Sequence, residues 1–214
     1  ERALYNPQRW NLYGYCLGDP INYYDLEGAS IQPVNILIQR QYSTGSIIYG
    51  TISVNGIIYG PTYESGIWHV PAGTYQGRLI VGEFVKYEKG KTEVYYAPAI
   101  AIFDKDGKRV EVFLGRRASI HEGSERSNLF GCIAVPKEVM DRIVNDLVTQ
   151  VRSYILSKAM QAADKSILLS GLDQVFMAWY ALDLLSLIMS PEIRQRINDS
   201  MSMLQINIRI SSAQ

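Results

Sequence analysis

Short runs rich in Val, Ile, Tyr and Thr alternate with turn residues over positions 34–114, a pattern that is typical of β-strands. Asn55-Gly56 separates two of these runs, and this dipeptide between β-rich runs is a strong signal for a tight hairpin. Residues 104–108 form a polar turn before the next run. We therefore predict a β-rich domain, with His121 near the end of one of its strands.

A different period begins after Pro136, where apolar residues recur every three or four positions and predict an amphipathic helix. The apolar stripe consists of Val139, Ile143, Leu147, Val151 and Ile155. Residues 167–189 are long and apolar enough to span a bilayer, but Asp173 and Asp183 would be costly there, so buried or membrane-surface helices are favoured. Residues 204–210 alternate strictly, which predicts a final strand.

Composition narrows the functional classes. The 214 residues include 21 basic and 21 acidic side chains, so the net charge is zero and no basic stripe favours nucleic-acid binding. No His/Asp cluster suggests a metal site, and no cofactor is expected. The two cysteines, Cys16 and Cys132, do not form a disulfide framework and are interpreted as free thiols. Because the chain opens at Glu1 without an initiator methionine, we expect it to be part of a longer protein.

The chemistry-bearing residues concentrate in positions 119–133, which hold one of the two histidines and one of the two cysteines. An imidazole near a thiol favours the thiolate, which is the nucleophilic form. His121 and Cys132 are therefore a candidate catalytic pair, and Glu122 and Glu125 lie close enough in sequence to orient the histidine. The alternative is that Cys132 is a small buried apolar residue and His121 a satisfied structural group.

The N-terminal segment carries a first resemblance. The stretch NLYGYCLGDPINYYDLEG, residues 11–28, resembles the end of the Rhs/YD-repeat core of polymorphic toxins, which a variable toxin domain follows. Residues 1–30 are accordingly assigned to the end of that core. Many members of the family cleave themselves after Asp-Pro-x-Gly-Leu. The matching residues here run from Asp25 to Ala29, with Leu26 in place of Pro and Ala29 in place of the final Leu.

A second resemblance covers roughly residues 35–136. The segments GTISVNGIIYGPTYE, HVPAGTY and SIHEGSERSNLFGCIAV follow one another in the order found in small L,D-transpeptidase-like domains. Those domains carry a short loop from His to Gly-Cys of this length. The resemblance implies an α+β fold, in which residues 31–136 form a β-rich L,D-transpeptidase-like domain and residues 137–214 form a helical extension.

The resemblance also implies roles for individual residues. Cys132 corresponds to the nucleophile and His121 to the base. Backbone N–H groups around Gly131 are the natural donors to the oxyanion. Arg117 is a candidate for holding the carboxylate of a peptide. Asn128 is a candidate polar group in the substrate site.

The sequence departs from this family at two positions next to the nucleophile. Family members usually place Ser or Thr three residues before the cysteine, and some place His two residues before it. Here those positions hold Leu129 and Phe130. Ser127 and Asn128 are the nearest polar substitutes.

Together the two resemblances imply a secreted antibacterial toxin tip that cleaves or exchanges peptidoglycan stem peptides through a Cys thioester. It would act in the periplasm or cell envelope of a target bacterium. Its expected partners are the Rhs core shell, an immunity protein and peptidoglycan stems, and residues 167–189 offer membrane contact. The alternative is a non-enzymatic, membrane-active toxin that acts through its apolar C-terminal helices. A nuclease or ADP-ribosyltransferase ranks last.

Overall fold

The computed structural model describes residues 32–161 except 89–90, 126 and 128, together with residues 191, 195, 198–199 and 201–212. The Rhs-like segment 1–30, the apolar stretch 167–189 and Asn128 therefore lie outside the described residues. No described helix has the length and apolar character that crossing a bilayer requires.

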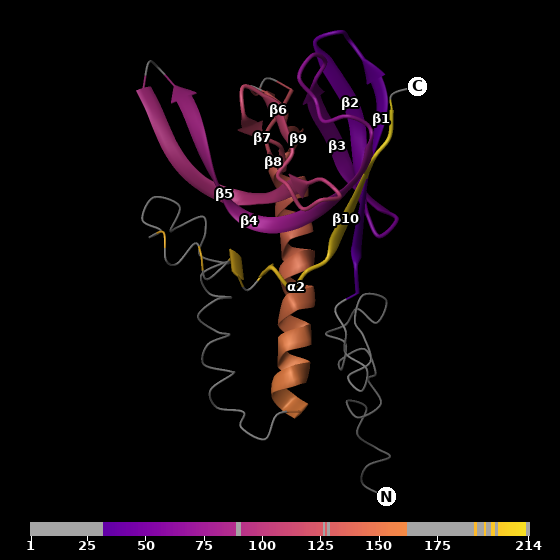
Figure 1. Cartoon of the computed structure of the whole chain (residues 1–214), viewed down its shortest axis with the longest axis vertical. Helices are drawn as coiled ribbons and strands as arrows, with labels where there is room; N and C mark the ends of the chain where they lie inside the picture. The colour runs from indigo at the N-terminus through magenta and orange to yellow at the C-terminus, as the bar shows by residue number, and fades with distance from the viewer. Residues whose placement is uncertain are drawn as a thin grey trace, which may run out of the picture.

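Eight strands form a closed barrel in the order β1-β10-β4-β5-β8-β9-β3-β2 (Figure 1). The bounds of these strands are β1 (Val34–Ser43), β2 (Ile47–Val54), β3 (Ile57–Ser65), β4 (Gly73–Glu88), β5 (Lys91–Phe103), β8 (Ser119–Glu122), β9 (Ile133–Val135) and β10 (Ile206–Ile210). The short strands β6 (Glu111–Phe113) and β7 (Arg116–Arg117) pair with each other in a separate hairpin. A long helix, α2 (Lys137–Gln161), follows β9 directly. The prediction of a β-rich α+β protein is confirmed.

The hairpin between β2 and β3 forms at the predicted dipeptide. Asn55 has a φ of 49° and Gly56 a φ of 86°, so both residues of the turn occupy the left-handed region. A two-residue type I′ turn needs this conformation at both central positions, and Asn-Gly adopts it at low cost. The turn sets the pairing of β2 with β3, and β3 in turn pairs with β9, which begins one residue after Cys132.

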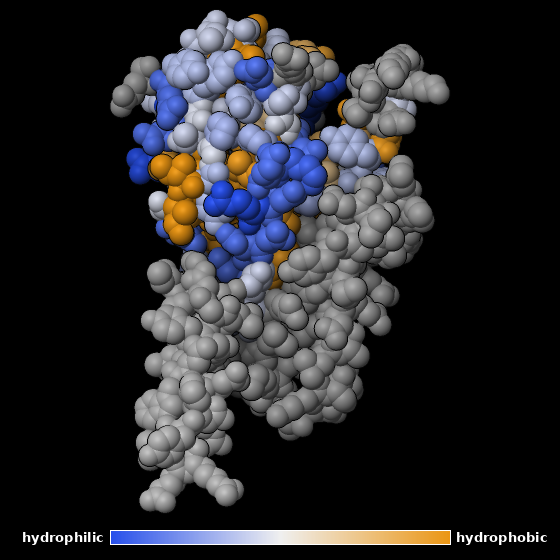
Figure 2. All heavy atoms as spheres, turned by 180° about the vertical axis from the view of Figure 1, so that it is seen from behind, coloured by the Kyte–Doolittle hydropathy of each residue, from blue (hydrophilic) through white to orange (hydrophobic). Residues whose placement is uncertain are grey.

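The core fills the barrel interior and continues onto α2. Alternate residues of each barrel strand point inward, and the largest of these side chains that are fully buried include Leu79 and the isoleucines at positions 36, 38, 52, 100, 102, 120 and 133. The predicted helical stripe joins the same cluster through Val139, Ile143, Leu147 and Val151. Seen from behind the view of Figure 1, the described surface is mainly hydrophilic, with separate hydrophobic areas (Figure 2).

The C-terminal strand is part of the barrel. As the alternating pattern predicts, residues 206–210 form a strand, β10, which pairs in parallel with β1 and antiparallel with β4. Ile206, Ile208 and Ile210 point inward and are at most 2% exposed. The range 137–214, which the sequence suggested as a helical extension, therefore contributes both α2 and β10 to the core of the preceding strands. A boundary at residue 136 does not mark the edge of that core.

Candidate functional site

Two parallel strands bring the candidate residues together. Strands β8 and β9 pair with Ile120 opposite Ile133 and His121 opposite Ala134. Because Ile120 and Ile133 point into the core, the residues on either side of them face outward. Ser119, His121 and Cys132 consequently share the outer face of the barrel wall.

The thiol of Cys132 is in contact with both neighbours on that face. The Oγ of Ser119 lies 3.7 Å from Sγ of Cys132, and the His121 side chain hydrogen-bonds the thiol. Nδ1 of His121 lies 2.6 Å from the carbonyl oxygen of Glu122. A carbonyl oxygen only accepts, so Nδ1 carries the proton and Nε2 is the nitrogen left for the thiol. The structure thus brings together the two residues that the sequence singled out.

The ionisation of the two groups is coupled. Burial raises the pKa of Cys132, but the hydrogen bond and charge of His121, together with hydrogen bonds from Ser119, outweigh it, so the pKa of Cys132 is lowered. Burial alone would lower the pKa of His121. The hydrogen bond and charge of Cys132, with smaller contributions from Glu122, outweigh burial, so the pKa of His121 is raised. Both shifts favour a thiolate beside an imidazolium, which is the reactive form of such a pair.

Arg109 is a residue near this pair that sequence reasoning missed. Its Nε and Nη2 donate to the carbonyl oxygen of Ala118 at 3.3 and 3.2 Å. Burial and the charge of Arg117 lower the pKa of Arg109, whereas the charge of Cys132 raises it. The guanidinium is therefore close enough to interact with the thiolate. The predicted residue, Arg117, lies exposed on β7. A bridge between Phe103 and Arg109 positions Arg109, and no local motif signals it.

The two positions that depart from the family pattern anchor the loop between β8 and β9. Leu129 is buried, with 7% of its surface exposed. The ring of Phe130 stacks on Phe113 at 5.4 Å, and Phe113 contacts Trp68 at 4.3 Å. The loop is held by apolar packing at these positions. The polar contact to the thiol comes instead from Ser119 on the neighbouring strand.

Gly131 shapes the backbone immediately before the nucleophile. Its φ is 87°, a conformation that favours glycine, and a Cβ at this position would lie 2.6 Å from Cβ of Val112. Its N–H donates to the carbonyl oxygens of Trp68 at 3.0 Å and Leu129 at 3.1 Å. This N–H is therefore engaged within the protein, so the N–H of Cys132 is the better candidate for an oxyanion donor.

The remaining residues at the end of β8 and in the loop between β8 and β9 make different contacts. Glu122 orients His121 through its backbone carbonyl. Glu125 accepts a hydrogen bond from the hydroxyl of Tyr49 at 3.1 Å. The hydroxyl of Ser127 accepts from the N–H of Ser124 at 2.8 Å, which makes it part of the loop's own turn. Of the two acidic residues, Glu122 is thus the one whose contact with His121 is observed.

Within the described ranges, no group of three or more His, Cys, Asp or Glu side chains is placed to hold a metal ion. Comparisons with protein-family models, curated proteins and solved structures find no match for this chain. The chemistry of the site must accordingly be argued from its own geometry. A thiolate with an imidazolium on an outward-facing surface suits nucleophilic attack followed by proton donation to a leaving group.

Proposed function

We propose that the protein is a cysteine-dependent acyl-transfer enzyme of the L,D-transpeptidase type, which acts on the peptide stems of peptidoglycan. The observation that carries this proposal is the hydrogen-bonded His121–Cys132 pair with its opposed pKa shifts. The stem-peptide substrate is inferred from the sequence resemblance of residues 35–136.

In the proposed reaction, the Cys132 thiolate attacks the carbonyl carbon of an amide next to a D-residue. The C–N bond breaks, the protonated His121 donates its proton to the leaving amine, and a thioester remains on Cys132. Neutral His121 then removes a proton from water or from an incoming amine, which attacks the thioester and displaces the Cys132 thiolate, so that the thiolate–imidazolium pair is restored. Water gives hydrolysis, and an amine gives exchange or transpeptidation.

Donors around the thiol have distinct tasks in this scheme. The N–H of Cys132 stabilises the oxyanion in this scheme, because the N–H of Gly131 already donates to carbonyl oxygens of the protein. Ser119 holds the thiolate in place. Arg109 and the exposed Arg117 supply positive charge for a substrate carboxylate on the same side of the site.

The biological setting is also part of the proposal. The Rhs-like segment supports a secreted toxin tip, delivered by an Rhs core shell into the periplasm or envelope of a target bacterium and neutralised in the producer by an immunity protein. Weakened or capped stems would damage a growing wall.

The test is mass spectrometry of stem peptides incubated with the whole chain. Wild type should cleave or exchange the terminal residue, and Cys132→Ala should reduce this activity to background while keeping the circular dichroism spectrum of the barrel. Cys16→Ser is the matched control, because it removes the other thiol, and it should remain active. Toxicity that survives Cys132→Ala would overturn the enzymatic proposal and favour the membrane-active alternative.

A further inference from the structure

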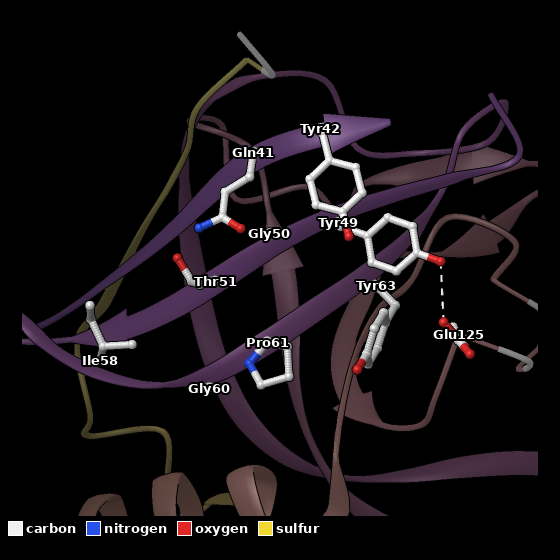
Figure 3. Close-up of a pocket in the computed structure, with 10 residues that line it drawn as sticks. All are labelled: Gln41, Tyr42, Tyr49, Gly50, Thr51, Ile58, Gly60, Pro61, Tyr63 and Glu125. Carbon is white, nitrogen blue, oxygen red and sulfur yellow. Dashed lines mark hydrogen bonds between the residues drawn. The ribbon is translucent and has the colours of Figure 1, made fainter. Parts of the chain in front are cut away.

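A second feature of the outer face lies beside the candidate catalytic pair. It is a surface groove of about 520 Å³ over strands β1, β2 and β3, bordered by Glu125 from the loop between β8 and β9 (Figure 3). We call it the tyrosine groove, after Tyr42, Tyr49 and Tyr63. None of these rings takes part in the catalytic contacts described above.

The three rings form a connected aromatic platform. Tyr42 and Tyr49 stack with their centroids 4.8 Å apart and their planes 12° from parallel. Tyr63 meets Tyr49 edge to face at 5.8 Å. Tyr42 remains 54% exposed, although stacking on a neighbour covers part of its surface. A large aromatic surface held in place by its neighbours binds a ligand with little further loss of side-chain freedom.

The polar groups that border this platform are mostly uncharged. Gln41 and Thr51 supply an amide and a hydroxyl, and Glu125 is the one charged side chain among the described residues that line the groove. Tyr49 donates its hydroxyl proton to Glu125 at 3.1 Å, which fixes the carboxylate at the rim. A groove lined without lysine or arginine does not suit a phosphate or a nucleic acid. Aromatic faces beside hydrogen-bonding groups suit an uncharged amphipathic ligand.

The groove and the candidate catalytic site lie along one row of the sheet. Tyr42 pairs with Tyr49, Tyr49 with Tyr63, Tyr63 with Ala134, and Ala134 with His121. Paired residues project on the same face, so this row crosses the outer wall from the tyrosines to the imidazole. Tyr63 lies two strand spacings from His121, which is about 10 Å. Ala134 between them is 0% exposed, because the loop between β8 and β9 packs against it. An extended ligand that occupies both places therefore passes over this loop.

We propose that the tyrosine groove is a saccharide-binding subsite, which holds a sugar of a glycopeptide while the attached peptide reaches Cys132. A pyranose ring presents C–H groups on its face and hydroxyl groups around its edge. The C–H face stacks on Tyr42 and Tyr49, and the hydroxyls bond to Gln41, Thr51 and Glu125. The link to Cys132 rests on the proposed function, whereas saccharide binding itself does not.

The first experiment measures binding without any reaction. The whole chain carrying Cys132→Ala is titrated with the tetrasaccharide of N-acetylglucosamine and followed by ligand-observed NMR. Adding Tyr42→Ala should weaken binding about fivefold, because it removes one stacking ring. Tyr42→Phe keeps the ring and should bind as the parent does. Val94→Ala, which trims an exposed side chain on β5 outside the groove, should also leave binding unchanged.

Three results would overturn the subsite. One is the absence of saccharide binding. Another is equal affinity in the Tyr42→Ala and Val94→Ala proteins. Displacement of the saccharide by a sugar-free stem peptide would assign the groove to peptide and overturn it as well.

The second experiment connects the groove to catalysis. Wild-type protein is given stem peptides with and without an attached disaccharide, and the preference in kcat/KM for the glycopeptide should disappear in Tyr42→Ala. Saccharide binding without processing of either peptide would leave the subsite standing and reject the proposed function. Processing of both peptides at equal kcat/KM by wild type would support the proposed function and reject the subsite's link to it.

Discussion

Two polar pairs lie on opposite faces of the same barrel wall. On the inner face, Arg40 bonds Glu64 through Nε at 3.0 Å and Nη2 at 2.6 Å, and the two residues are only 5% and 1% exposed. On the outer face, His121 and Cys132 form a hydrogen-bonded pair that is half-buried. Glu64 lies opposite Ile133, the residue after Cys132. Neighbouring strands thus carry one pair inward and the other outward.

The difference shows how burial separates structural from reactive groups. The inner pair is fully enclosed, and its geometry is bidentate, so both charges are matched and substrate has no access. The outer pair is only partly buried, and its two pKa values move so that the thiolate and imidazolium are favoured. The alternation of a β-strand is sufficient to place both kinds of pair within one wall.

The largest expected effect is on the inner pair. Glu64→Ala leaves the guanidinium of Arg40 buried without its carboxylate, and such a loss typically costs about 3–5 kcal/mol. The free energy of unfolding, measured by urea titration, should fall by that amount.

The double variant Arg40→Met with Glu64→Leu provides the control, because it removes both charges and keeps most of the volume. It should recover most of the lost stability. If Glu64→Ala and the double variant are equally unstable, the loss comes from packing and the comparison of the two pairs fails.

An intermediate effect is expected at the outer site from Gly131→Ala. The new Cβ meets Val112 and the φ of 87° becomes strained, so stability should fall by about 1–3 kcal/mol and Cys132 should react more slowly with iodoacetamide. Gly107→Ala isolates the backbone cost, since its φ is 73° and nothing lies within 4 Å of an added Cβ. Gly107→Ala should be the milder of the two and leave the reactivity of Cys132 unchanged. Equal effects in both variants would mean that the contact with Val112 is unimportant.

The smallest expected effect concerns the pH dependence of the outer pair. The pKa of Cys132 is lowered, and the thiolate is the deprotonated form, so alkylation should begin at a lower pH than for an ordinary cysteine. Ser119→Ala removes a hydrogen bond that stabilises the thiolate. Its loss should move the alkylation midpoint to higher pH and slow the reaction at neutral pH about fivefold, for a bond worth about 1 kcal/mol.

His121→Ala supplies the reference for that measurement, because it removes the larger stabilising partner and should move the midpoint further. Peptide-resolved mass spectrometry separates Cys132 from Cys16. A midpoint unchanged in Ser119→Ala would show that the 3.7 Å contact has no role in holding the thiolate.

Local signals in the sequence predicted several parts of the molecule. The Asn55-Gly56 turn, the helical stripe after Pro136 and the alternation of residues 204–210 each depend on neighbours in the chain, and all three predictions are confirmed. The candidate pair could also be identified from the sequence, because His121 and Cys132 are close in the chain and their residue types are chemically distinctive. The assignment of residues 1–30 and the toxin function remain predictions.

Contacts between distant segments could be read only from the tertiary structure. No local pattern indicates that β10 lies between β1 and β4, that Arg109 approaches Cys132, or that Arg40 pairs with Glu64. Ser119 likewise becomes the polar neighbour of the thiol only through the register of β8 and β9. By itself the sequence determined the local elements and the residue types that react, because turns, helical periods and side-chain chemistry are short-range properties. Strand register and barrel closure depend on which apolar faces of distant segments pack together, so only the tertiary structure determines them.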